Sequence, residues 1–297
     1  MSRTGLVLAR EGSQFRVDTE DGIVTAVLRG RIKRDDSRAL VGDRVTLEQS
    51  GGDWAIATVA ERTNLLERRI PGGRGTRPIA ANLDQIFVMT AAADPEPIPQ
   101  LLDRLLVLAE SNDIPAAVIV NKIDRASGEG LIKRFEQVGY PVFPISVTTG
   151  AGLAPLLATL HSEVSLVTGA SGVGKSSLLN VLQPGLTLRT GVVSQKEGRG
   201  RHTTVTAEML PLDGGGYLVD TPGFSDVGFW GLEPRGLVQC FPDLQRHAEE
   251  CRFPDCTHRT EPGCGVRAAV GTGVAEDRYQ SFLTFLDELN TELRDWE

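Results

Sequence analysis

The chain has 297 residues, of which 40% are hydrophobic and 24% charged, and its formal net charge is −8. This length is sufficient for two or three domains with hydrophobic cores. The sequence contains no apolar run long enough to span a bilayer, and residues 1–10 lack the apolar segment of a signal peptide. We therefore expect a cytoplasmic protein with no membrane partner.

Charge is distributed unevenly along the chain. Residues 1–79 hold 14 Lys and Arg against 11 Asp and Glu, a net charge of +3, whereas the remainder holds 17 against 28, a net charge of −11. Two basic stretches lie in the first part: "RGRIKR" at 29–34, and a group of arginines between 62 and 77. Such stretches are typical either of a nucleic-acid-binding surface or of ordinary solvated charge.

Residues 1–65 contain five short β-type runs, separated by turn-rich pieces such as "EDG" and "SGGD". Five short strands at this spacing predict a small barrel or sandwich. We expect an OB-type β-barrel over residues 1–69, a fold that often binds nucleic acid, and the spacing is also compatible with an SH3-like barrel. Residues 70–78, rich in Gly, Pro and Arg, are predicted to form a linker or loop.

From residue 82 onward, apolar runs alternate with segments of helical periodicity. The pieces "QIFVMTAA", "PAAVIV", "PVFPIS" and "EVSLVTG" read as strands, and the segments between them read as helices. This alternation is typical of a parallel sheet covered by helices. We expect an α/β domain over residues 70–235.

The four residues "NKID" directly follow one of these strands. The carboxylate of Asp124 can accept hydrogen bonds from the ring N1–H and the exocyclic amine of guanine, and a site built in this way rejects adenine. We expect Asn121 to contact the base and to tie neighbouring loops together, and the stem of Lys122 to pack along the base plane. Ser146 and Val147, after the next strand, are candidates for a second guanine loop whose backbone N–H meets the base oxygen.

The segment "GASGVGKS" matches the phosphate-loop pattern G-x-x-x-x-G-K-[ST], with an apolar strand before it and a helix after it. Glycines let the backbone wrap around phosphates, and the helix N-terminus favours anions. Lys175 is expected to reach the β- and γ-phosphates and Ser176 to bind Mg²⁺. The alternative is a glycine-rich turn with an unrelated lysine. The residues expected to line the nucleotide here are Gly169, Ala170, Ser171, Gly172, Val173, Gly174, Lys175, Ser176 and Ser177.

A second group of residues is expected around the γ-phosphate. Asp220 ends a strand and precedes Thr-Pro-Gly, so its carboxylate can hold Mg²⁺ through water while the N–H of Gly223 meets the γ-phosphate. Thr203 and Thr204 are both candidates for closing over Mg²⁺ and the γ-phosphate. His202 beside them is either a residue that orients the attacking water or an exposed loop histidine.

Phe224 stands where many GTPases carry the glutamine that orients the attacking water. A phenylalanine ring can neither donate nor accept the hydrogen bond that this role requires. We therefore expect slow intrinsic hydrolysis and dependence on a partner that completes the site. The catalytic candidates within the chain are Lys175, Thr203, Thr204 and His202.

The order of these motifs is reversed, because the guanine motifs precede the phosphate loop. This order is that of a conventional GTPase sheet that has been cut and rejoined, a change that folds tolerate when the original termini lie close together. The permuted order also connects the segment after Asp220 directly to the cysteine-rich part of the chain.

All four cysteines lie between 240 and 264, a clustering that suggests a metal rather than disulfides. The ligands Cys251, Cys256, His258 and Cys264 suit one tetrahedral, structural Zn²⁺. Cys240 and His247 are the alternative ligands, and a cluster of free thiols is the alternative to a metal. We expect a small, partly helical zinc-binding domain over residues 236–297. One face of its last helix carries Tyr279, Phe282, Leu283, Leu286, Leu289 and Leu293.

The combination of "VGDRV", "NKID", "GASGVGKSS", "RHTT", "DTPG" and C-x4-C-x-H-x5-C resembles the ribosome small subunit-dependent GTPase A (RsgA) family of circularly permuted GTPases, over nearly the whole chain. The resemblance implies a GTPase that converts GTP to GDP and phosphate in late maturation of the small (30S) ribosomal subunit. It implies binding to that subunit and its rRNA, and stimulation by it. We expect a monomer with no DNA partner.

Two other interpretations are compatible with parts of the sequence. One is a GTP-regulated binding switch for a non-ribosomal protein partner, which the acidic second half of the chain favours. The other is an ATP-dependent phosphate-loop enzyme such as a kinase, which Asp124 argues against because its carboxylate matches guanine.

Overall fold

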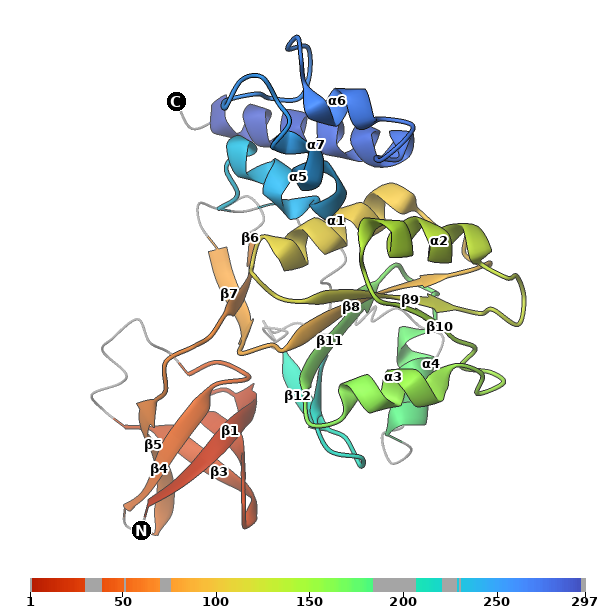
Figure 1. Cartoon of the computed structure of the whole chain (residues 1–297). Coiled ribbons are helices and arrows are strands. Elements are labelled where there is room, and N and C mark those ends of the chain that lie inside the picture. Colours follow the sequence, from red (N-terminus) through yellow and green to blue (C-terminus); the bar gives the residue numbers. More distant parts are fainter. Residues whose placement is uncertain are drawn as a thin grey trace, which may run out of the picture.

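The computed structural model describes residues 2–29, 39–50, 52–69, 76–183, 207–220, 229 and 231–294. A β-barrel, an α/β layer and a helical C-terminal part follow one another from the bottom to the top of Figure 1. Among the described residues, no helix combines the length and the apolar character that a bilayer crossing requires.

The barrel is a closed ring of five strands in the order β1–β2–β3–β5–β4–β1, in which only β3 and β5 run parallel. Closure removes the free sheet edges. Alternation along β2 turns Phe15 and Val17 into the barrel core, as period-2 patterning predicts. The ring confirms the expected OB-type barrel. The strands are β1 (Ser2–Glu11), β2 (Gln14–Thr19), β3 (Gly22–Leu28), β4 (Arg44–Ser50) and β5 (Asp53–Val59).

A two-stranded hairpin, β6 (Leu65–Arg69) and β7 (Thr76–Ala81), connects the barrel to the α/β layer. The prediction of a loop over 70–78 was wrong for residues 76–78, because β7 pairs antiparallel with β6. The expected boundary at 69/70 lies inside this hairpin. Nearby, Arg62 donates to the fully buried carboxylate of Asp43 at 2.7 and 2.9 Å, so this arginine of the basic stretch stabilises the fold.

The central sheet has the strand order β10–β9–β8–β11–β13–β12. All neighbours are parallel except β12, which is antiparallel to β13. Strands covered by helices on both faces read as continuous apolar runs, which is why the sequence signal was clear. The strands are β8 (Gln85–Ala91), β9 (Ala116–Asn121), β10 (Val142–Pro144), β11 (Val164–Gly169), β12 (Glu208–Pro211) and β13 (Tyr217–Asp220).

Helices cover both faces of this sheet. Helices α1 (Pro99–Glu110) and α2 (Glu129–Val138) lie on the face toward the C-terminal part, and α3 (Leu153–Leu160) and α4 (Lys175–Leu182) lie on the other. Strands β8, β9 and β10 precede β11 in the chain but lie beside it in the sheet, as a circular permutation predicts.

The barrel and the central sheet are joined by hydrogen bonds. Strand β1 pairs antiparallel with β12 at Ala9 and Glu208, so the strands form one continuous sheet. Arg16 of β2 forms an ion pair with Glu208 at 3.1 Å, and the Tyr217 hydroxyl donates to Asp18 at 2.8 Å. Three contacts therefore hold β1 and β2 against β12 and β13.

The C-terminal part packs on α1 through the apolar face of its last helix. That face buries the expected Tyr279, Phe282, Leu286 and Leu289, and adds Phe285, which is fully buried. Helix α1 lies between the sheet and α7, which explains why seven of its twelve residues are buried. The elements are a 3-10 helix η1 (Pro234–Cys240), α5 (Pro242–Ala248), α6 (Gly265–Ala269) and α7 (Glu276–Arg294).

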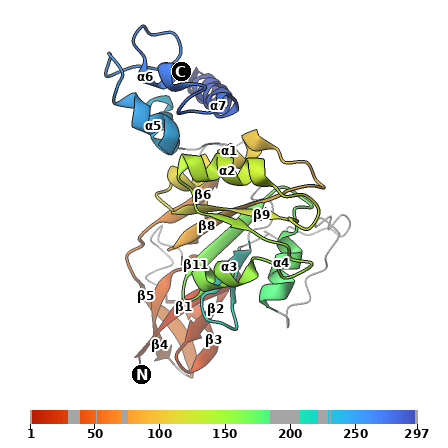
Figure 2. The same cartoon turned by 45° about the vertical axis from the view of Figure 1, so that its right-hand side comes forward.

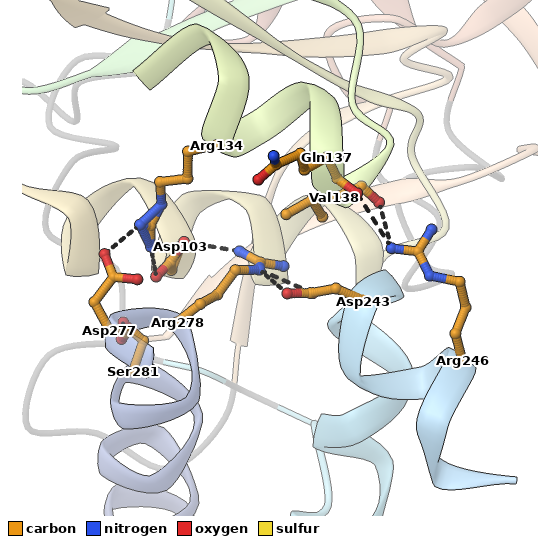
Figure 3. A network of polar contacts seen from close by, with 9 residues as sticks. All are labelled: Asp103, Arg134, Gln137, Val138, Asp243, Arg246, Asp277, Arg278 and Ser281. Carbon is orange, nitrogen blue, oxygen red and sulfur yellow. Dashed lines mark hydrogen bonds and ion pairs between the residues drawn. The ribbon is translucent and has the colours of Figure 1, made fainter. Parts of the chain in front are cut away.

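A buried network of ion pairs crosses the interface between α1, α2 and the C-terminal part (Figure 3). Arg278 donates to Asp103 at 2.7 Å and to both oxygens of Asp243 at 2.8 Å. Arg134 donates to Asp103 at 3.0 Å and to Asp277 at 2.5 Å. Burial alone would lower the pKa of Arg278, but the carboxylates of Asp243 and Asp103 have the larger combined effect and raise this pKa. Each buried charge thus depends on its partners.

We predict that Asp103→Ala will lower the free energy of unfolding by about 3–5 kcal/mol, because Arg278 and Arg134 each lose a buried carboxylate partner. Urea denaturation followed by circular dichroism measures this change. The control is Lys133→Ala, which removes an exposed ion pair with Glu129 in α2 and should cost less than about 1 kcal/mol. Similar effects of the two substitutions would show that the buried network is not stabilising.

Candidate functional site

The loops after β8, β9, β10 and β11 lie at one edge of the central sheet, because neighbouring parallel strands end on the same side. Open α/β sheets bind their ligands at this carboxyl edge. It brings together the predicted residues of 121–124, 146–147 and 169–177. Asp220 ends β13, which is parallel to β11, and therefore joins them at the same edge.

The phosphate loop passes from the end of β11 to the first turn of α4. Gly169 has φ 146°, and a Cβ atom there would lie 2.0 Å from the carbonyl oxygen of Met89 in β8. Gly174 has φ 107°, and a Cβ atom there would lie 2.4 Å from Nδ2 of Asn121. Side chains are excluded at both positions because the loop packs directly on β8 and on the end of β9.

Lys175 is the first residue of α4, and its side chain turns back over the loop. Its Nζ donates to the carbonyl oxygens of Gly169 at 2.8 Å and Ala170 at 2.7 Å. Burial lowers the pKa of Lys175, and the nearby carboxylate of Asp220 opposes this shift. Ser176, the next residue, is exposed, so its hydroxyl is accessible to a ligand at the helix N-terminus.

Asp220 is half-buried at the end of β13, directly across from Glu208 of β12. Burial raises the pKa of Asp220, Glu208 raises it further, and Lys175 partly opposes both effects. The ionised carboxylate is therefore disfavoured in the folded chain, and an additional positive charge at this position would stabilise it. Such an arrangement suits a residue that holds a cation.

Asn121 connects three loops through one side chain. It is buried, its Nδ2 donates to the carbonyl oxygen of Val173 at 2.8 Å, and its Oδ1 accepts from the N–H of Val147 at 3.1 Å. The phosphate loop and the loop after β10 are thus fixed to the end of β9. The N–H of Val147, which the sequence suggested for a base oxygen, is engaged with Asn121 in this structure.

The remaining guanine candidates lie around Asn121. Asp124 is exposed, so its carboxylate is accessible to a ligand. Ser146 is fully buried, and its hydroxyl accepts from the N–H of Thr149 at 3.2 Å, which shapes the loop after β10. The N–H of Ile123 donates to the carbonyl oxygen of Ile145 at 3.2 Å and holds the two loops side by side.

The loop after β8 also contributes to this site, and the sequence analysis missed it. Lys122 donates through Nζ to the carbonyl oxygens of Asp94 and Gly172, the latter at 2.8 Å. Asp94 also forms an ion pair with Arg125 at 3.5 Å. The only signal in the sequence was the turn-rich "AADPEP" after an apolar strand, and this signal does not indicate which loop it meets.

Four predicted residues lie outside the described part of the chain. They are His202, Thr203, Thr204 and Gly223. Phe224 also lies outside it.

The four predicted metal ligands come together as one cluster. The ligand atoms of Cys251, Cys256, His258 and Cys264 all lie within 4.8 Å of one another. His258 has φ 61°, and its carbonyl oxygen accepts from the Tyr279 hydroxyl of α7 at 2.6 Å, which fixes the loop to the helix. The alternatives Cys240 and His247 are both described, and neither belongs to this cluster.

The spacing of these atoms fits a tetrahedral ion. For metal–sulfur bonds of about 2.3 Å and metal–nitrogen bonds of about 2.05 Å, tetrahedral geometry requires S···S separations of about 3.8 Å and S···N separations of about 3.6 Å. The Sγ atoms of Cys251 and Cys264 are 3.9 Å apart, and they lie 3.4 and 3.6 Å from Nδ1 of His258. Burial raises the pKa of Cys256 to about 12, and a cation would oppose that shift because it binds the thiolate.

Comparison with known proteins agrees with this architecture. The model of the family described as RsgA GTPase matches residues 59–230. Two solved structures are similar over almost the whole chain. The crystal structure of YjeQ from Thermotoga maritima has a TM-score of 0.81 at 34% identity, covering 97% of this chain and 99% of that one. YloQ, described as a circularly permuted GTPase, has a TM-score of 0.79 at 28% identity, covering 98% and 96%.

Curated relatives match over the same length. A protein of Gemmatimonas aurantiaca named small ribosomal subunit biogenesis GTPase RsgA is 46% identical, covering 97% of this chain and 98% of the relative. The protein of the same name from Moorella thermoacetica is 41% identical, covering 96% and 97%. The chain therefore belongs to the RsgA GTPase family of circularly permuted GTPases.

Proposed function

We propose that this protein hydrolyses GTP to GDP and phosphate in late maturation of the small (30S) ribosomal subunit, in the cytoplasm, and that the subunit stimulates it. The position of Asn121 is the observation that supports nucleotide binding. Its side chain joins the phosphate loop to the two loops expected to hold guanine, so the parts of one nucleotide site are connected by direct hydrogen bonds. The ribosomal part rests on the names of the relatives.

Guanine is bound by the loops after β9 and β10. Asp124 accepts from the ring N1–H and the exocyclic amine, and its accessibility supports this role. Lys122 packs its stem along the base while its Nζ holds the phosphate loop and the loop after β8. Ser146 and Val147 form the second guanine loop, and Asn121 fixes their position.

The phosphates are bound by residues 169–177 and by the N-terminus of α4. Lys175 exchanges its two loop carbonyls for the β- and γ-phosphates, whose negative charge also offsets the cost of burying the ammonium. Ser176 would bind Mg²⁺ and Asp220 would hold the ion through water, and Mg²⁺ would neutralise charge on the phosphates during hydrolysis. The raised pKa of Asp220 supports its role beside a cation.

Hydrolysis requires a group that orients water, and Phe224 cannot supply it. Within the chain, Thr203 and Thr204 are the two candidates for closing over Mg²⁺ and the γ-phosphate, Gly223 is the candidate for meeting the γ-phosphate, and His202 is the candidate for orienting the water. The small subunit and its rRNA complete the arrangement and raise the rate. The OB-type barrel carries the rRNA contact, which agrees with the net positive charge of residues 1–79.

The Cys₃His cluster binds one structural Zn²⁺ and has no catalytic role. Four protein ligands leave no open position on a tetrahedral ion, and the observed separations fit thiolate and imidazole bonds to zinc. We propose that residues 1–69, 70–235 and 236–297 act as the rRNA-binding, nucleotide-binding and zinc-binding domains of a monomer.

The ribosomal role predicts stimulation by the small subunit. With purified small subunits, the rate of phosphate release from GTP should rise by about 10²-fold, the lower end of what one positioned proton-transfer group contributes. Large subunits or buffer alone should leave the rate low, and ATP should not be hydrolysed because Asp124 rejects adenine. Equal rates with both subunits and with buffer would contradict the ribosomal role and leave the GTPase activity standing.

The environment of Asp220 predicts a pH-dependent effect on stability. The pKa of the Asp220 carboxyl group is higher in the folded chain than in the unfolded chain. Ionisation of this group therefore lowers the free energy of unfolding at pH values above the folded-state pKa. This loss of stability disappears at pH values below the pKa of the group in the unfolded chain. Asp220→Asn should therefore raise the melting temperature at neutral pH, and the gain should fade as the pH falls toward 4. The same variant should lose Mg²⁺-dependent hydrolysis.

The control for this experiment is Asp213→Asn. Asp213 is an exposed residue between β12 and β13, and its carboxylate accepts a hydrogen bond from Gln183. The substitution should leave hydrolysis unchanged and show no gain in melting temperature at neutral pH. Retention of Mg²⁺-dependent hydrolysis by Asp220→Asn would exclude the proposed role in holding the ion.

The Cys₃His cluster predicts a bound metal. Elemental analysis should find about one zinc per chain, and Cys256→Ser should lose most of it because three ligands hold zinc less tightly than four. Cys240→Ser is the matched control, since Cys240 lies outside the cluster. Its thiol donates a hydrogen bond to the carbonyl oxygen of Gly236 at 3.8 Å. Loss of zinc from the control but not from Cys256→Ser would contradict the ligand assignment.

A further inference from the structure

A row of residues in register crosses from the barrel to the central sheet and ends at the nucleotide site. Ala9 of β1 lies opposite Arg16 of β2 on one side and opposite Glu208 of β12 on the other. Glu208 in turn lies opposite Asp220 of β13. Residues directly opposite each other on antiparallel strands project from the same face, with Cβ atoms about 4.5–5.5 Å apart. The row therefore connects a charge of the barrel to Asp220.

A register shift in β1 produces this row. The pairing of β1 with β2 passes from Val7 to Ala9 and skips Leu8. Val7 packs in the core of the barrel, whereas Leu8 packs in the core shared with β8 and α1. Such a shift re-aims the side chains beside it. The small side chain of Ala9 leaves room above β1, and the guanidinium of Arg16 forms an ion pair with Glu208 at 3.1 Å.

Glu208 and Asp220 lie on the side of the sheet that carries α4. Leu218 belongs to the same apolar cluster as Leu178 of α4, and residues two apart on a strand share a face, so Asp220 projects to that side. Lys175 is the first residue of α4. Burial lowers the pKa of Lys175 and the charge of Asp220 raises it, so the two side chains interact. Glu208 thus lies beside the group of residues expected to bind the phosphates and Mg²⁺.

Glu208 and Asp220 form an unfavourable pair of like charges. Carboxylates directly opposite each other on neighbouring strands destabilise a sheet. Burial and the charge of Glu208 both raise the pKa of Asp220, so the repulsion reaches the residue that would hold the ion. A cation at Asp220 would relieve this repulsion, and the charge of Glu208 would then add to the attraction for the cation.

Arg16 lies between two acidic side chains. Its guanidinium is 3.1 Å from Glu208 and 3.9 Å from Glu11, which precedes the turn between β1 and β2. The contact with Glu208 offsets a negative charge that would otherwise act on the cation. Because this ion pair is partly exposed, it is weak, and Glu208 can exchange Arg16 for a stronger positive charge.

We propose that Glu208 is a second acidic residue of the Mg²⁺ site, and that Arg16 of the barrel is a positioning residue that lowers the Mg²⁺ affinity of this site by holding Glu208. This inference rests on the proposed nucleotide-binding function. Glu208 increases the negative charge that faces the ion, and Arg16 offsets part of it. The affinity for Mg²⁺ therefore depends on a residue of the barrel.

The test measures the Mg²⁺ concentration that half-saturates binding of a fluorescent β,γ-imido analogue of GTP to the full-length chain. The analogue is not hydrolysed, so the measurement is independent of turnover. In Glu208→Gln this concentration should rise by about threefold, the size typical of one partly exposed charge pair, because a negative charge beside Asp220 is lost. In Arg16→Gln it should fall by about threefold, because Glu208 is released. Arg16→Lys keeps the charge and should reverse most of that fall.

The double variant Arg16→Gln/Glu208→Gln separates action through Glu208 from a long-range effect of charge. Without Glu208, Arg16 still has Glu11 beside it. Adding Arg16→Gln to Glu208→Gln should therefore change the half-saturating concentration by less than about 1.5-fold, which is the non-additivity expected of residues that act as a pair. A threefold fall on adding Arg16→Gln would overturn the positioning role.

The matched control is Arg3→Gln, which removes the same charge from the barrel. Arg3 forms an ion pair with Asp21 at 3.0 Å, and its side chain is 33% exposed, against 34% for Arg16. It lies six residues before Ala9 in β1, a separation of about 20 Å, where surface charges are screened. The control should stay within about 1.5-fold of the unaltered chain. Equal falls in Arg3→Gln and Arg16→Gln would assign the effect to the net charge of the barrel and overturn the proposal.

The other outcomes are also decisive. Two single variants are used because the Arg16–Glu208 pair also helps to join the barrel to the sheet, and circular dichroism checks the folding of each. No change in the folded variants would overturn the proposal while the proposed function stands. Binding of the analogue without dependence on Mg²⁺ would overturn this inference and leave nucleotide binding standing. Failure of the unaltered chain to bind the analogue would overturn the proposed function and this inference with it.

Discussion

The buried amide of Asn121 is the contact on which the nucleotide site depends. One side chain satisfies a carbonyl of the phosphate loop and an N–H of the loop after β10, and both partners are backbone atoms. A carboxylate could not donate to Val173, and an aliphatic side chain would leave both groups unpaired. The requirement extends to Gly174, because any side chain there would displace the amide. The glycine of the phosphate motif is therefore explained by contact within the protein as well as by access to phosphate.

Circular permutation leaves this contact intact because it depends on the order of strands in space. Strand β11 lies between β8 and β13, so the phosphate loop meets the end of β9 and Asp220 regardless of which strand comes first in the chain. The permutation instead changes the segment to which Asp220 is connected. The chain continues to Phe229 and into the C-terminal part, where α1 is already packed against α7. The C-terminal part is therefore connected to the α/β layer in two ways: covalently, through the chain that follows Asp220, and noncovalently, through the packing of α7 on α1.

Features that depend on local patterning could be predicted from the sequence. Phe15 and Val17 alternate as barrel strands require, the motif ending in Lys175 is complete, and three cysteines and a histidine lie close in the chain. The long-range features could not be predicted. Asp103 and Arg278 are 175 residues apart and read as ordinary surface charges until the fold pairs them. Likewise residues 76–78 of β7 were predicted as a loop, because their Pro and Arg content hides a pairing that β6 provides.

The pairing of β1 with β12 has a mechanical consequence. The barrel is attached to the central sheet through the backbone pairing of Ala9 with Glu208, the Arg16–Glu208 ion pair and the Tyr217–Asp18 hydrogen bond. A force applied to the barrel by a large particle would load these contacts in shear, and β12 would carry that load to the strand that ends in Asp220. The stiffness of these contacts therefore determines how much of a pull on the barrel reaches the edge of the sheet at which Asp220 lies.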